Sequence, residues 1–447
     1  MRGLYCFRVV ARHLPVAVTG RAEVVPVASK SRLKENIVSL LVLQGANYLL
    51  PLIIVPYLVR VLGPANFGRV AFAQAFVQYF IVLTDYGFNL TATRAVVQTR
   101  NDPVALGRLV SSVMAVKVLL MVAGFLAMNM LIGVMPDEHR DYGLFAVVYL
   151  GVLGNVIFPV WLFQGVERMR HITILTIASR FAVTIAVFLL VKNPDDLRIA
   201  AALQSMGFVI AGVLSLFVLP RVVVVRLQFP ALDDMWRVAK DGWHVFVATI
   251  GGSLYNSSNV FFLGLLASPL VVGYYAAAEK LIKAIQSAIT PVSQAVYPHV
   301  ATLLEKSREQ ALDFLRKLLR LQGMATLAIS FVLFALAHPI ALLMFGHRYE
   351  QSGDLVRLMS LIPFVVGINN VLGAQILVQF NLGKLLSTSI LFPALIHVTA
   401  LFFVVKEFGS TGVAIMAVFT EVLVMVIRVF GLVRWHPEIY NGVLGAR

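Results

Sequence analysis

Basic side chains interrupt long apolar runs in this 447-residue chain, namely Lys117, Arg180, Lys280 and Lys283. A charge at the centre of a bilayer costs about 2.5–3.5 kcal/mol on the insertion scale, so it should face a partner or a hydrated cavity. At about 1.5 Å per helical residue, Lys117, Arg180 and Lys283 lie about 12–20 Å inside their runs. Because Lys and Arg bind phosphate by charge and hydrogen bonding, we predict an anionic ligand.

Carboxylates occur in the same kind of apolar run, at Asp85, Glu279 and Glu421. Asp85 and Glu421 could each neutralise Lys117 or Arg180 inside the protein. Alternatively, Asp85, Glu279 and Glu421 are candidates to couple movement of the ligand to an ion gradient. The sequence does not identify the ion as H⁺ or Na⁺. Glu279 and Lys280 are adjacent and point in different directions, so one of them can be structural.

Uncharged polar residues line up with these charges at helical spacing. One face of a predicted helix carries Glu279, Lys283, Gln286, Thr290, Gln294 and Tyr297, because residues three and four apart share a face. Further candidates for lining a polar cavity are Gln44, Asn47, Asn256 and Asn369. Asn, Gln and Tyr suit sugar hydroxyls, although isolated polar residues in apolar helices also serve simply as packing contacts between helices.

The amino-acid composition indicates a membrane protein. Hydrophobic residues make up 59% of the chain, charged residues 13%, and the mean hydropathy is +0.86, whereas soluble domains carry about 25% charged residues. A disordered chain would be poor in large apolar residues. Cys6 is the single cysteine, which excludes a disulfide scaffold. The net charge of +15 fits basic cytoplasmic loops and gives no argument for nucleic acid.

The apolar runs predict an all-helical protein with twelve spans. Lipid cannot satisfy backbone N–H and C=O groups, and the runs do not alternate as barrel strands do. The spans are placed at 37–62, 68–93, 109–135, 142–165, 172–191, 199–219, 243–266, 270–300, 321–346, 354–380, 385–405 and 412–433. Prolines inside spans should kink them, at Pro51, Pro56, Pro159, Pro291, Pro363 and Pro393.

Lys and Arg are concentrated in alternate loops, chiefly 94–108, 221–242 and 301–322, whereas 136–141 (PDEHRD) and 193–196 (NPDD) are acidic. The basic loops should be cytoplasmic, which places both termini there. The predicted order is a basic, disordered tail at 1–36, an N-lobe at 37–220, a linker at 221–242, a C-lobe at 243–434 and a C-terminal tail at 435–447. Alternatively, the true start of translation lies nearer Lys30.

A faint internal repeat supports this division. Residues 59–76 resemble 263–280, with Gly68 matching Gly273. Because each half has an even number of spans, both enter the membrane from one side. A pseudo-two-fold axis should then run along the membrane normal, with the ligand site between the halves.

The sequence lacks the motifs of several classes of enzyme. The chain has no G-x-x-x-x-G-K-[S/T] phosphate loop, no H-E-x-x-H or Cys/His metal spacing, and no G-x-S-x-G elbow. These absences favour transport without a cofactor or a metal. A polymerase of lipid-linked sugars would be expected to use a long outer loop, and a purely structural scaffold would not need aligned buried charges.

The segments 36–76, 84–96 and 272–300 resemble the Wzx-type polysaccharide flippases, in the superfamily that includes multidrug and toxin extrusion transporters. The resemblance covers about 33–435. It implies two six-helix lobes around a V-shaped cationic cavity in the bacterial inner membrane. It also implies movement of an undecaprenyl-diphosphate-linked repeat unit from the inner to the outer leaflet by alternating access, for O-antigen, capsule or exopolysaccharide.

By this resemblance, Arg94, Lys117, Arg180, Lys280 and Lys283 are the candidates to bind the substrate. The polymerase and chain-length-control proteins of the same pathway are expected partners. The alternatives are an ion-coupled drug exporter, whose cavity should be anionic or aromatic, and a peptidoglycan-precursor flippase, which usually has more than twelve spans.

Overall fold

The computed structural model describes residues 30–226 and 228–443, without the side chains of 30–52, 138, 248 and 254–256. Of the predicted disordered tail at 1–36, residues 1–29 lie outside the described residues, whereas 30–36 are the start of a helix rather than disordered. The predicted C-terminal tail at 435–447 lies partly outside the described residues. Within the described ranges the chain is helical and contains no strand.

The helices have these bounds: α1 Lys30–Asp85, α2 Phe88–Thr99, α3 Pro103–Gly133, η1 Asp137–His139, α4 Tyr142–Ile157, α5 Val160–Gly165, α6 Met169–Leu190, η2 Pro194–Asp196, α7 Leu197–Val222, α8 Leu232–Leu266, α9 Pro269–Ser287, α10 Ile289–Lys306, α11 Arg308–Ala335, α12 Ala337–Phe345, η3 His347–Tyr349, α13 Glu350–Met359, α14 Ile362–Asn370, the π-helical η4 Val371–Leu377, α15 Gly383–Trp435 and α16 Pro437–Val443.

Eight helical stretches in the described part of the chain are long and apolar enough to cross a membrane. Their outer surfaces carry large apolar side chains, such as Met130 at 78% exposure and Phe331 at 69%. Such a surface is stable in lipid and would aggregate in water. The chain is therefore a multi-pass membrane protein.

The longest helices bend at glycine. The backbone is non-helical at Gly63 inside α1 (φ 72°) and at Gly409 inside α15 (φ 55°), a conformation that favours glycine. Both bends lie in gaps expected between spans, Gly63 between 37–62 and 68–93 and Gly409 between 385–405 and 412–433. Of the prolines expected to kink helices, Pro159 lies at a break, directly before α5.

The predicted basic loops are largely helical. Only Ser307 separates α10 from α11, so the loop expected at 301–322 is wrong. The physical reason is a helix cap, because the Ser307 hydroxyl accepts a hydrogen bond from the Gln310 N–H. The segment 94–108 likewise lies mostly in α2 and α3, and the linker expected at 221–242 shortens to 223–231.

Asp102 caps α3 by accepting hydrogen bonds from the N–H groups of Val104 (2.9 Å) and Ala105 (3.1 Å). These bonds hold the pKa of Asp102 below its usual range, because they favour the charged form. The cap is therefore fully present above the ordinary carboxyl pKa and is lost as the pH falls through the lowered value.

We expect Asp102→Ala to speed hydrogen exchange in the first turn of α3 at pH 7, and acidification of the wild type to lower the protection factor of the same turn, once the slower intrinsic exchange at low pH is taken into account. Exchange mass spectrometry of the peptide that starts at Pro103 measures this effect. The control is Asp195→Ala, which changes an exposed carboxylate in another turn. Unchanged exchange in Asp102→Ala would contradict the capping role.

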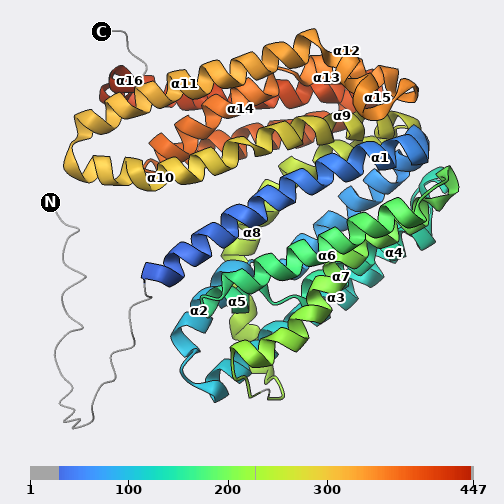
Figure 1. Ribbon diagram of the computed structural model, residues 1–447, viewed down its shortest axis with the longest axis vertical. Helices are drawn as coiled ribbons and strands as arrows, with labels where there is room; N and C mark the ends of the chain where they lie inside the picture. The colour runs from blue at the N-terminus through green and yellow to red at the C-terminus, as the bar shows by residue number, and fades with distance from the viewer. Residues whose placement is uncertain (1–29, 227, 444–447) are drawn as a thin grey trace.

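Two groups of helices converge at one end of the molecule and diverge at the other (Figure 1). The N-terminal group is α1–α7 and the C-terminal group is α9–α16, with α8 between them. One buried apolar cluster runs through both groups and includes Leu58, Phe72, Tyr275 and Val413. At the diverging ends the groups have separate clusters, around Val371 in one and around Phe88 in the other.

Two glycines let the groups touch at the converging end. A Cβ on Gly68 of α1 would overlap the carbonyl oxygen of Pro269, and a Cβ on Gly273 of α9 would overlap the carbonyl oxygen of Pro64. The contact is reciprocal, because each Pro-x-x-x-Gly segment places its glycine against the other's proline. Arg60 adds hydrogen bonds to the carbonyls of Leu343 and Met344 at the end of α12. We call these contacts the seam.

Candidate functional site

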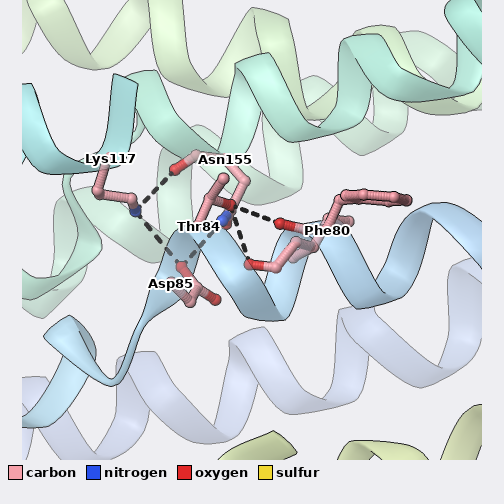
Figure 2. Close-up of polar contacts among 6 residues, drawn as sticks. Phe80, Thr84, Asp85, Lys117 and Asn155 are labelled. Atoms are coloured by element: carbon pink, nitrogen blue, oxygen red, sulfur yellow. Dashed lines mark hydrogen bonds and ion pairs between the residues drawn. The ribbon is translucent and has the colours of Figure 1, made fainter. Parts of the chain in front are cut away.

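An ion pair lies buried inside the N-terminal group (Figure 2). Lys117 Nζ of α3 is 3.4 Å from Asp85 Oδ1 and 3.4 Å from the carbonyl oxygen of Asn155 in α4. Asn155 Nδ2 in turn donates to Asp85 Oδ1 at 2.9 Å. The three side chains thus link α1, α3 and α4 at one buried point.

The end of α1 explains how Asp85 reaches this position. Thr84 donates back to the Phe80 carbonyl at 3.0 Å, and the chain then turns through Tyr86 (φ 45°) and Gly87 (φ 76°) before α2 begins. A Cβ on Gly87 would come within 2.7 Å of the Val245 side chain in α8. The turn therefore depends on glycine both for its backbone angle and for its closeness to α8.

The burial of Lys117 decides what this pair can do. Lys117 is 1% exposed, and its ammonium meets a carboxylate and a carbonyl of the same helix group. In this conformation no ligand can touch it. Of the two roles left open by the sequence, neutralisation of Asp85 is the one that this geometry matches.

A second polar site lies in the C-terminal group, around a cavity of about 80 Å³. Glu279 Oε2 is 3.1 Å from Lys283 Nζ one turn along α9, and Gln286 and Glu421 also line the cavity. The Lys283 side chain is 49% exposed, whereas that of Glu279 is 11% exposed. The pair therefore has a buried acid and an accessible base.

Two buried polar residues lie in or near this site, and sequence reasoning missed both: His397 lines the cavity, and Arg428 is connected to it through other residues. His397 is fully buried and hydrogen-bonds Thr420 Oγ1 at 2.7 Å and Asn259 Oδ1 at 2.8 Å. Arg428, 7% exposed, donates through Nε to Ser389 Oγ at 3.1 Å. Arg428 follows Glu421 by seven residues, so both lie on one face of α15. This spacing could have identified Arg428 from the sequence.

Asn369 connects Arg428 with Glu421. Arg428 Nη1 donates to the Asn369 carbonyl at 2.6 Å, and Asn369 Nδ2 donates to Glu421 Oε2 at 3.2 Å. The predicted polar residue Asn369 therefore belongs to this network. It lies two residues before the π-helical segment η4, a feature that often occurs at functional sites.

Among the described residues, neither Arg180 nor Lys280 forms an ion pair with a carboxylate. Arg180 is partly buried in α6, and no described carboxylate pairs with its guanidinium. Lys280 of α9 lies 3.5 Å from Gln74 Oε1 and 5.2 Å from the ring centre of Phe67, both on α1. Lys280 therefore lies between the two helix groups.

The remaining predicted residues are dispersed. Arg94 is exposed on α2, Thr290 is partly buried and Gln294 is exposed on α10, beyond the break at Ala288 that divides the predicted stripe. The side chains of Gln44, Asn47 and Asn256 lie outside the described residues. No group of three or more His, Cys, Asp or Glu suited to a metal occurs in the described chain.

The sequence model of a family described as "Polysaccharide biosynthesis protein" matches residues 33–304. The chain belongs to this family. A curated relative from Escherichia coli (strain K12), named "Putative O-antigen transporter", is 31% identical over 396 residues, which is 89% of this chain and 95% of the relative. Family membership thus agrees with the resemblance seen in the sequence.

The fold is shared with transporters of known structure. An inward-facing multidrug resistance MATE family transporter of the MOP superfamily superposes with a TM-score of 0.67 at 16% identity, over 91% of this chain and 98% of that one. The lipid II flippase MurJ in an inward closed conformation gives a TM-score of 0.69 at 12% identity, over 91% and 89%. At such low identities the likeness establishes the fold of this family member, and the function must be argued from its residues.

Proposed function

We propose that the chain is a flippase that moves an undecaprenyl-diphosphate-linked oligosaccharide from the cytoplasmic to the outer leaflet of the inner membrane. The observation that carries this proposal is Arg180, a cation within an apolar helix for which no described carboxylate serves as counter-ion. Lys283, accessible beside its buried acid, adds a second cation. Such cations offset the desolvation of a diphosphate, and the polar side chains around them suit sugar hydroxyls.

The proposed architecture has twelve spans in two lobes of six. The bends at Gly63 and Gly409 divide α1 and α15 into two spans each. The remaining spans are α3, α4 with α5, α6, α7, α8, α9 with α10, α11 with α12, and α13 with α14 and η4. The N-lobe is 37–220 and the C-lobe 243–434, related by an axis along the membrane normal, with both termini in the cytoplasm. The reciprocal contact of the two Pro-x-x-x-Gly segments supports that axis.

In this topology the seam closes the outer side and the diverging helix ends open to the cytoplasm, so the structure represents the inward-open state. The head of the substrate would enter between the diverging ends while the polyprenyl chain remains in lipid. Rocking of the lobes would break the seam and open the outer side. Contacts that differ between the two states must supply the free energy for this shift.

For ion coupling we propose the cavity of the C-lobe. Glu279 and Glu421 both line it, and Lys283, which is more exposed than Glu279, pairs with Glu279 there. Binding of H⁺ or Na⁺ at these carboxylates would release Lys283 to the diphosphate. Asp85 is then the counter-ion of Lys117 and does not couple.

We expect Arg180→Ala and Lys283→Ala each to lower delivery of lipid-linked repeats at least tenfold, because a diphosphate that passes between the lobes would lose a charge partner in each variant. Delivery is measured as surface glycan in cells and as accumulation of the lipid-linked unit in the inner leaflet, at equal protein level. Lys317→Ala is the matched control, since its side chain is 76% exposed beside Asp313. Arg180→Lys should restore part of the activity by keeping the charge. Normal surface glycan in both alanine variants would reject the proposed site.

A further inference from the structure

A pocket of about 420 Å³, lined by both polar and apolar side chains, lies between α2, α3 and the first turns of α8, away from the cavity of the C-lobe. It is lined by Gln98, Arg108, Ser112, Asp234, Arg237 and Asp241, among others. Nothing in the transport cycle described above uses these residues.

The first turns of α8 are amphipathic with their polar side toward the protein. Asp234, Arg237 and Asp241, spaced three and four residues apart, line the pocket. Leu232 and Trp236 are 81% and 73% exposed on the opposite side of the helix. A helix with its apolar side outward fits a membrane interface, so the pocket is screened from lipid.

Close packing holds the walls of the pocket together. The Arg226 N–H donates to the Pro103 carbonyl at 3.3 Å, and a Cβ on Gly107 would overlap the Arg226 carbonyl oxygen. Arg108 Nε donates to Gln228 Oε1 at 3.0 Å. These contacts hold the segment before α8 against α3 and so position the first turns of α8.

The charge of the pocket indicates the chemistry of its ligand. Two arginines are balanced by two aspartates, and Arg237 lies 3.5 Å from Asp234. A phosphate would be repelled by Asp234 and Asp241, whereas hydroxyl groups can both donate to carboxylates and accept from guanidinium groups. An uncharged, hydroxyl-rich ligand can hydrogen-bond both kinds of charged group, and the Arg237 side chain is 73% exposed.

Arg94 lies on the same face of α2 as two residues that line this pocket. It is exposed on α2, three residues after Thr91 and four before Gln98, both of which line the pocket. Residues at these spacings share a helix face. A ligand with a neutral saccharide joined to a phosphate can therefore contact the pocket and Arg94 together.

We propose that this pocket binds the saccharide of the lipid-linked substrate at the cytoplasmic end of the N-lobe, before the diphosphate reaches Arg180 and Lys283. This inference rests on the proposed function and deepens it, because it assigns sugar recognition to α2, α3 and α8. The pocket then contributes to selection of the repeat unit, while the deeper cations recognise the diphosphate shared by all such lipids.

The test measures binding of the free repeat-unit oligosaccharide, released from its lipid by mild acid, to the full chain in nanodiscs by calorimetry. We expect Arg237→Ala and Asp241→Ala to weaken binding at least tenfold. Lys240→Ala, which removes an exposed charge from another side of the same helix turn, should bind normally. Binding of sugar-free undecaprenyl diphosphate should be unchanged in all three variants. If a variant of α8 does not fold, Gln98→Ala on the opposite wall takes its place.

Absence of saturable saccharide binding to the wild type, or equal binding by the wild type and the pocket variants, would overturn the inference. In that case transport of the lipid-linked unit by wild-type vesicles would leave the proposed function standing. Saccharide binding without any such transport would instead contradict the proposed function.

Discussion

Replacing Gly68 and Gly273 together by alanine should reduce surface glycan at least tenfold without lowering the protein level. Each new Cβ would overlap a backbone carbonyl of the facing segment, and backbone cannot move aside as a flexible side chain can. Alanine is about 1 kcal/mol better than glycine inside a helix, so weakened helices cannot explain the loss. The expected defect is a seam that no longer closes.

Thiol labelling tests this cause directly. Cys6 is the only cysteine in the chain, so a Cys6→Ser background carrying Gln74→Cys reports on one site below the seam. A membrane-impermeant reagent added outside should label this site in the double alanine variant and not in the parent. The control is Gly251→Ala with Gly252→Ala, where a new Cβ meets no atom closer than 3.8 Å. Equal labelling of parent and variant would refute the seam as the outer closure.

Lys117→Ala should be the most destabilising single change in the N-lobe. It leaves the Asp85 carboxylate without its cation inside the helix group, and breaking a buried pair in this way costs roughly 3–5 kcal/mol. We expect a large loss of folded protein, measured as the melting temperature in detergent and the amount in the membrane. The control is Lys317→Ala, which removes a lysine from an ion pair on the exposed surface and should leave both measurements unchanged.

The double variant Lys117→Met with Asp85→Asn distinguishes a structural role of Asp85 from a role in ion coupling. Both charges are removed together, and methionine fills the space of the lysine stem, so folding should return. If Asp85 is only a counter-ion, glycan delivery should return as well. A double variant that folds but does not deliver glycan would show that the Asp85 carboxylate has a further role in transport.

The sequence could predict the apolar runs and their polar faces, because both follow from the helical period. Glu279 and Lys283 were expected on one face and are in fact an ion pair one turn apart. From the sequence, Lys117 had two possible roles: pairing with Asp85 or binding a ligand. Choosing between them needs the packing of α1, α3 and α4.

Helix ends were harder to predict than helices. Ser307 alone converts an apparent loop into a junction between two helices, and the gaps expected between two pairs of spans are only sharp bends at Gly63 and Gly409. In both places a single residue's hydrogen bond or backbone angle decides the outcome. Arg428 was overlooked because it lies near the predicted end of its span, where an arginine is ordinarily solvated.

The apolar cluster shared by the two helix groups bears on how the protein is made. Leu58 and Phe72 are synthesised long before Tyr275 and Val413, which complete their packing. Until those residues are synthesised, the inner faces of the N-terminal helices are in contact with lipid tails. Hydrocarbon solvates such faces without the penalty that water imposes, so the bilayer itself serves as a temporary partner during biogenesis.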